Sequence, residues 1–199
     1  MRFSDRQQAN GITSTMTKQP PVNRTISSRS WNVLSSSQQQ TERLGQALGQ
    51  ALQAGQTIAL YGPLGAGKTA LVRGIALGLG ASPTAVTSPT FVVIHEYQGH
   101  LPMAHMDWYR IGSLHELEST GLTEYFAGQT VTVIEWAERG LPLLPQDRID
   151  ITLHHRTAFS RMIQLKTTGS TSHTALSRAR TTYCTSQRQR SNRKGTITS

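Results

Sequence analysis

Residues 62–69 read Gly62-Pro-Leu-Gly-Ala-Gly-Lys-Thr69 and match the phosphate-loop pattern G-x-x-x-x-G-K-[ST] at every defined position. The preceding stretch, Thr57–Tyr61, is a short apolar run of the kind found in buried parallel strands. After the loop, apolar residues recur at helical spacing from Leu71 to Leu79, and Gly80 marks the expected end. This order predicts an α/β domain built around a phosphate-binding loop between a strand and a helix.

The loop predicts a nucleotide ligand, ATP with Mg²⁺. Lys68 is expected to reach the β- and γ-phosphates, and the Thr69 hydroxyl is expected to ligate Mg²⁺. A glycine-rich turn without a ligand would give no reason for lysine followed by threonine at these positions. The expected nucleotide contacts come from consecutive residues of the loop and the helix start: Gly65, Ala66, Gly67, Lys68, Thr69 and Ala70.

Two carboxylates stand where predicted strands end, and both are candidate ligands of the Mg²⁺ ion. Asp107 follows the strand-like run that begins at Pro102, and Glu135 follows the β-branched run that begins at Thr130. Ligands of open α/β sheets bind beyond the carboxyl ends of the strands. Each residue alone could be an ordinary surface carboxylate, but the phosphate loop favours the metal role. Lys68, Asp107 and Glu135 are the expected catalytic residues, and which carboxylate positions the attacking water is left open.

The rest of the central region predicts further elements of one compact α/β core. Ser37 is placed to cap a helix that ends before Gly55, and Ser113 with Glu116 has the spacing of a capping box. Further strands, some of them paired in hairpins, are predicted at Phe91–Tyr97, Pro102–Asp107, Thr130–Glu135, Arg148–His154 and Ser160–Lys166.

Composition divides the chain into three parts. Residues 1–30 are polar and predict a disordered extension, residues 31–166 predict the folded domain, and residues 167–199 predict a disordered basic tail. The Arg-bearing, acid-poor N-terminus also faintly resembles a transit peptide. No apolar run is long enough for a membrane span or a signal-peptide core, so we expect a cytoplasmic protein without membrane contact. Cys184 is the single cysteine, which excludes an intrachain disulfide.

The net charge of +9 arises from the C-terminal part of the chain. Residues 1–150 hold 11 basic and 11 acidic side chains, whereas residues 151–199 hold nine basic and no acidic ones. Such a tail could touch RNA through phosphate contacts. The alternative is a solvated extension, which the absence of interleaved aromatic residues favours.

Other features of the sequence leave alternatives open. Thr90 lies in a Thr-Ser-Pro-Thr segment that is either a phosphate-sensing switch or a simple turn. His95, His100 and His105 lack the spacing of a zinc site and are interpreted as structural. A small-molecule kinase would carry an arginine-rich lid, and a GTPase an Asn-Lys-x-Asp segment; neither occurs here. A P-loop small-molecule kinase and a nucleotide-dependent binding module without fast turnover stay alternatives to an ATPase.

Four segments in order, GPLGAGKTALVRGIALGLG, TSPTF, HMDWYRIGSLHELESTGLTEYF and VIEWAERG, resemble the TsaE (YjeE) family. That resemblance covers about residues 31–166 and implies a single P-loop NTPase domain with a mixed, partly parallel sheet flanked by helices. It implies that Asp107 and Glu135 are the two acidic residues near the metal. It also implies nucleotide contacts by Gln38, in the N-terminal stretch, and by Arg161, at the start of the last strand.

The same resemblance implies a function and partners. Members of the family are ATPases of bacterial tRNA N6-threonylcarbamoyladenosine (t6A37) biosynthesis. They bind the TsaD–TsaB complex, in which TsaD transfers the threonylcarbamoyl group to adenosine 37 of tRNA. The resemblance therefore implies slow ATP hydrolysis by the isolated chain and indirect contact with tRNA through the complex.

Overall fold

The computed structural model describes residues 29–82, 94–126 and 128–195. Thr90 and nearly all of the expected N-terminal extension, residues 1–30, lie outside this range; Ser30 already belongs to the first strand. The strands of the described part form one seven-stranded sheet in the order β1-β7-β6-β2-β5-β4-β3. Their bounds are β1 Ser30–Ser35, β2 Thr57–Tyr61, β3 Ile94–Tyr97, β4 Met103–Asp107, β5 Val131–Glu135, β6 Ile149–His155 and β7 Arg161–Thr167.

The sheet is mixed, as predicted. Strands β6, β2, β5 and β4 are mutually parallel and form its centre. Strands β3 and β7 each close an antiparallel hairpin, with β4 and β6 respectively, and β1 pairs antiparallel with β7 at one edge. Both predicted hairpins are therefore confirmed. The parallel centre carries its loops at the carboxyl ends of β2, β5 and β4, where the sequence placed the candidate site.

Helices α1 and α3 begin at the capping residues that the sequence predicts. They are α1 Gln38–Gly49, α2 Lys68–Gly78, α3 Leu114–Ser119 and α4 Ser170–Gly195, with 3₁₀ helices η1 Leu122–Phe126 and η2 Ala137–Leu143. The Ser37 hydroxyl accepts from Gln40 N at the start of α1, and Ser113 accepts from Glu116 N at the start of α3. The Glu116 carboxylate in turn accepts from Gly112 N, so this turn is closed from both sides.

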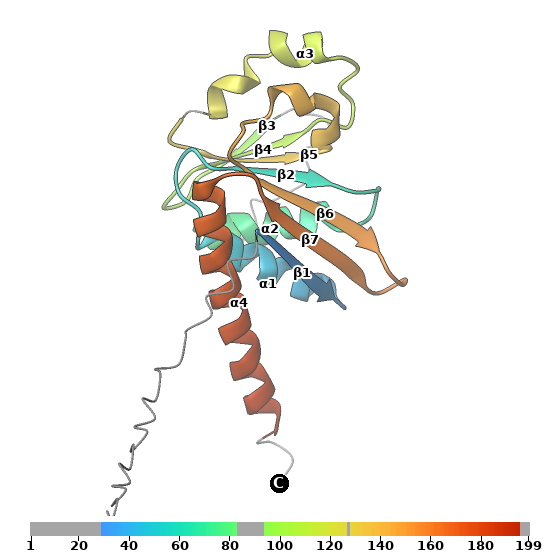
Figure 1. Cartoon of the computed structure of the whole chain (residues 1–199), viewed down its shortest axis with the longest axis vertical. Helices are drawn as coiled ribbons and strands as arrows, with labels where there is room; N and C mark the ends of the chain where they lie inside the picture. The colour runs from blue at the N-terminus through green and yellow to red at the C-terminus, as the bar shows by residue number, and fades with distance from the viewer. Residues whose placement is uncertain (1–28, 83–93, 127, 196–199) are drawn as a thin grey trace, which may run out of the picture.

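Each face of the sheet packs against a different set of helices (Figure 1). Helices α1 and α2 cover one face and bury the larger apolar cluster, which includes Ile58, Leu60 and Ile151. The backbones of α1 and α2 touch, since a Cβ added at Gly45 would lie only 2.9 Å from the Gly74 Cα. On the other face, α3, η1 and η2 surround a smaller cluster. Within the described ranges, no helix is both long and apolar enough to cross a bilayer.

The prediction of a disordered tail from residue 167 is wrong for residues 170–195. Thr167 completes β7, and residues 170–195 form α4, which packs beside α1 and β7. The physical reason is local. One side of the helix carries four buried residues, Ala175, Leu176, Ala179 and Tyr183. Their burial offsets the conformational entropy lost when the helix becomes ordered, which the polar residues alone could not do.

Candidate functional site

The phosphate loop joins β2 to α2 through backbone that only glycine tolerates at two points. Gly62 has φ +131°, and a Cβ there would collide with the Leu153 carbonyl oxygen of β6. Gly67 has φ +100° and stands at the N-terminus of α2. The loop therefore connects β2 to α2 as predicted from the sequence. The N-terminus of α2 faces the loop and adds its partial positive charge there.

The Lys68 side chain lies inside the loop. Its residue is only 5% exposed, and its ammonium group donates to the carbonyl oxygens of Gly62 at 2.7 Å and Pro63 at 3.0 Å. The ammonium also sits 3.9 Å from the centre of the Trp136 ring, which is cation–π distance. Burial lowers the pKa of Lys68, and nearby carboxylates, above all Glu135, oppose that shift.

Glu135 links the loop to the carboxyl end of β5. The Thr69 hydroxyl donates to Glu135 Oε1 at 3.1 Å, and His105 Nε2 lies 3.0 Å from the same oxygen. Since an ionised carboxylate only accepts, His105 Nε2 is the donor in this pair. His105 is fully buried and Glu135 is 3% exposed, so both bonds lie in a region of low dielectric. The structure thus brings together two predicted metal ligands, Thr69 and Glu135.

Asp107 lies beside Glu135, because β4 and β5 are parallel and their last residues are in register. Its Oδ1 accepts from Tyr109 N at 2.9 Å, which fixes the carboxylate in the turn after β4. Burial raises the pKa of Asp107; the Tyr109 N–H bond opposes this shift, and the charge of Glu135 adds to it. A carboxylate with a raised pKa between a lysine and a second carboxylate is typical of a functional site.

Of the two more distant predicted contacts, Arg161 reaches the loop. Its Nη1 donates to Thr41 Oγ1 at 3.2 Å and would lie 3.3 Å from a Cβ on Gly67, so the guanidinium rests against the loop. Arg161 Nε is buried and has no hydrogen-bond partner in the described part of the chain. Gln38 behaves differently, because its amide donates to Glu42 on its own helix. A nucleotide contact by Gln38 stays a prediction.

Two residues at this site were not predicted there from sequence. His105 was interpreted as structural, although its position two residues before Asp107 puts both side chains on the same face of β4. That spacing was the available signal. Trp136 has φ +59° and ψ +41°, a left-handed conformation that is rare outside glycine, and it packs against Tyr109 with ring centres 4.8 Å apart. Nothing in the sequence indicates that conformation or its contact with Lys68.

The residues present fit a nucleotide with Mg²⁺. The glycine backbone leaves the loop open to phosphate oxygens, and Lys68 supplies a positive charge inside it. Thr69, Glu135 and Asp107 offer a hydroxyl and two carboxylates, the hard oxygen ligands that Mg²⁺ prefers. Among the residues described, no group of three or more His, Cys, Asp or Glu side chains could hold a metal alone. A partial set is what Mg²⁺ needs when phosphates and water complete its shell.

The fold and the loop define a P-loop NTPase-type domain. The chain belongs to the TsaE family, because the family profile described as "Threonylcarbamoyl adenosine biosynthesis protein TsaE" matches residues 35–163. This family acts in the biosynthesis of threonylcarbamoyladenosine in tRNA. Helix α4 lies beyond the matched residues.

Individual relatives agree with this assignment. The chain is 43% identical to the TsaE protein of Treponema pallidum over 120 residues, which is 60% of this chain and 88% of that protein. It is 48% identical to TsaE of Bacillus subtilis over 100 residues, 50% of this chain and 61% of that protein. Its structure is similar to the crystal structure of Bacillus subtilis YdiB, with a TM-score of 0.64, 30% identity, and coverage of 75% of this chain and 93% of that one.

Proposed function

We propose that this chain is the Mg²⁺-dependent ATPase subunit that acts with the TsaD–TsaB complex to form the threonylcarbamoyl group on adenosine 37 of tRNAs reading codons that begin with adenine. The observation that carries the proposal is the 3.1 Å hydrogen bond from Thr69 to Glu135. This bond joins the first turn of α2 to the carboxyl end of the neighbouring parallel strand β5. Phosphoryl-transfer sites of this loop class place the metal between these two elements.

Each residue of the site has a role in this proposal. Lys68 would hold the β- and γ-phosphates, while Thr69 and Glu135 would hold Mg²⁺, which supplies Lewis-acid stabilisation of the phosphate charge. Arg161 would contact the nucleotide from β7, and its buried, unpartnered Nε supports such a contact. Asp107, with its raised pKa, would orient water beside Glu135.

The proposed partner is supported by the family's role and not by a surface in the structure. Since the family acts in tRNA threonylcarbamoyladenosine biosynthesis, the chain would serve the TsaD–TsaB pair that performs the transfer. ATP hydrolysis would then drive repeated turnover of that complex and would not itself form the new bond. A slow rate in isolation is the expected consequence.

The test is Mg²⁺-dependent ATP hydrolysis by the purified chain, alone and with a TsaD–TsaB pair. We expect slow turnover alone and a clear increase with the pair. Lys68→Ala should weaken ATP binding roughly 10-fold or more, because it removes charge-assisted bonds to phosphate. Lys166→Ala, which removes an exposed lysine of β7, is the matched control. Equal ATP affinity in the two variants would remove the phosphate loop from the mechanism, and indifference to the pair would remove that partner.

A further inference from the structure

Helix α4 is the most basic element among the described residues. Its 26 residues contain no acid and six basic side chains: Arg178, Arg180, Arg188, Arg190, Arg193 and Lys194. It follows the residues that match the family, so neither the phosphate loop nor the two carboxylates accounts for it. Two features of α4 therefore call for an explanation: its attachment to the domain and the binding partner of its positive charges.

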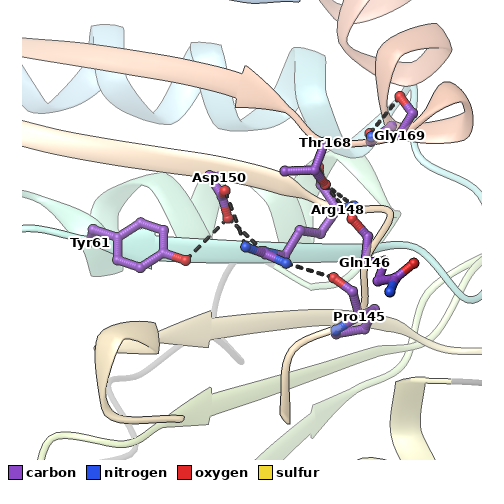
Figure 2. Close-up of polar contacts among 8 residues, drawn as sticks. Tyr61, Pro145, Gln146, Arg148, Asp150, Thr168 and Gly169 are labelled. Carbon is purple, nitrogen blue, oxygen red and sulfur yellow. Dashed lines mark hydrogen bonds and ion pairs between the residues drawn. The ribbon is translucent and has the colours of Figure 1, made fainter. Parts of the chain in front are cut away.

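The start of α4 is held by the segment that precedes β6. Asp147 Oδ2 accepts from Thr171 N at 2.9 Å and Oδ1 accepts from Ser172 N at 3.0 Å, while the Thr171 hydroxyl also donates to Asp147. Partial burial raises the pKa of Asp147, but these hydrogen bonds outweigh it and lower the pKa to about 2. Thr168 donates to the carbonyl oxygens of Gln146 at 2.6 Å and Arg148 at 3.0 Å (Figure 2). The helix is therefore capped by a fixed part of the domain.

The first half of α4 uses up its apolar side chains against the domain. Ala175, Leu176 and Ala179 are at most 3% exposed, and the Tyr183 ring meets Trp31 of β1 edge-on, with centres 5.6 Å apart. Tyr183 is the last buried residue of the helix, Ser186 and Gln187 are still half-buried, and the C-terminal end of α4 projects away from the sheet (Figure 1). Residues 188–192 are all exposed. We call residues 184–192 the α4 arm.

We propose that the α4 arm docks RNA, with Arg188 and Arg190 contacting phosphates of the tRNA on which the family acts. Both side chains are exposed, and each carries a full positive charge. A membrane surface would need an apolar face, and the apolar residues of α4 are already buried. A protein interface would need an apolar centre, which residues 185–192 lack. A phosphate backbone needs only fixed positive charge.

The start of α4 and the nucleotide site lie at opposite ends of β2. Gln56, just before β2, lines a hollow of about 260 Å³ together with Thr171 and Arg178 of α4. Helix α4 therefore begins at the amino end of β2, whereas the phosphate loop follows its carboxyl end. The proposal relies on the family's role with tRNA but not on ATP hydrolysis, and binding can be measured without nucleotide.

The test is equilibrium binding of a fluorescently labelled tRNA transcript to the whole chain across a salt series. We expect wild-type dissociation constants in the micromolar range that rise steeply with salt. Arg188→Gln with Arg190→Gln should weaken binding roughly 10-fold and lower the log–log salt slope by about 1–2, since each phosphate contact contributes about 0.7–0.9. Arg156→Gln with Lys166→Gln removes two exposed charges elsewhere and should leave both quantities near wild type. Arg188→Lys with Arg190→Lys keeps both charges and should bind tRNA nearly as tightly as the wild type does.

Three outcomes would overturn the proposal. Wild-type chain that does not bind tRNA would end it directly. Equal losses in the arm variant and the Arg156/Lys166 variant would show that charge alone, and not the arm, determines binding. Unchanged tRNA affinity in the arm variant would show that Arg188 and Arg190 do not contact the RNA. A change in helical circular dichroism or in association with TsaD–TsaB would then assign the arginines to helix stability or to a protein partner. Glutamine has nearly the helix propensity of arginine, so the helix itself should survive the substitution.

Discussion

Glu135 and Asp150 are two carboxylates on the strands that flank β2, and they differ in what surrounds them. Glu135 ends β5 on the face covered by α1 and α2, where its partners are the Thr69 hydroxyl and His105. Asp150 lies on the opposite face of β6, bound by Arg148 Nε at 2.8 Å and by the Tyr61 hydroxyl at 3.1 Å (Figure 2). Asp150 is thus neutralised by an ion pair with Arg148, two residues before it on the chain.

The difference teaches how to tell a site from a scaffold in this fold. A carboxylate paired with a guanidinium is already satisfied, and its charge holds the start of β6 against Tyr61. A buried carboxylate whose partners are a hydroxyl and an imidazole has no guanidinium paired with it, so it can still bind a metal ion. We therefore expect changes at Glu135 to affect catalysis and changes at Asp150 to affect stability.

The largest effect is expected for Glu135→Gln. The amide can still accept from Thr69, so the fold should survive, but the charge that would hold Mg²⁺ is lost. ATP hydrolysis should fall about 100-fold, the usual magnitude for removal of one preorganised electrostatic group. ATP affinity should stay within a few-fold of wild type. Steady-state hydrolysis and equilibrium ATP binding check this, and an unchanged rate would exclude Glu135 from the site.

Asp150→Asn should show the reverse pattern. It leaves Arg148 without its charge partner, in a pair whose side chains are 18% and 21% exposed. Removing one partner of a fully buried ion pair destabilises a protein more than this, and removing one partner of a surface pair destabilises it less. We therefore expect a loss of about 1–2 kcal/mol in unfolding free energy. The midpoint of thermal unfolding should drop by about 3–6 °C, with hydrolysis within twofold of wild type. Glu118→Gln on α3, which is exposed, should change neither.

The Glu135 site could be predicted from the sequence, because its residues lie in a local motif or at the ends of strands. The loop pattern located Lys68 and Thr69, and strand ends located Asp107 and Glu135, because parallel strands finish at the same edge of a sheet. The Asp150 cluster was not predicted. Tyr61 and Asp150 are 89 positions apart and meet only because β6 pairs with β2, an order that hydrophobic pattern does not specify.

The error at α4 has the same physical origin. Composition indicated disorder, because polar residues cannot offset the entropy of ordering. Four well-placed apolar residues and a cap from Asp147, 24 positions before Thr171, were enough to order the helix. Both depend on contacts with distant parts of the chain. Propensity read along the sequence does not include them.

A smaller effect on catalysis is expected for His105→Asn. His105 touches only Glu135 among the catalytic groups, so it acts as a positioning residue, and its loss should let the carboxylate rotate. The hydrolysis rate should fall roughly 10-fold while KM for ATP stays constant, since substrate contacts remain. His115→Asn, at an exposed position of α3, is the control. A rise in KM with an unchanged rate would contradict the positioning role.

The smallest effect, and the sharpest test of the Asp150 cluster, is expected for Tyr61→Phe. Burial, followed by the charge of Asp150, raises the pKa of Tyr61 to about 12, whereas an unfolded tyrosine titrates near 10. Between these values the folded chain binds more protons than the unfolded chain, so this contribution to stability is complete below about pH 10 and is lost as the pH rises through about 12. Tyr61→Phe should therefore start about 1 kcal/mol less stable and lose less stability over that window, so that the two curves converge. Denaturant unfolding from pH 9 to 12 measures this. In an Asp150→Asn background the difference should shrink, because part of the rise in the pKa of Tyr61 comes from that charge. The same difference in both backgrounds would mean that Tyr61 and Asp150 are not coupled.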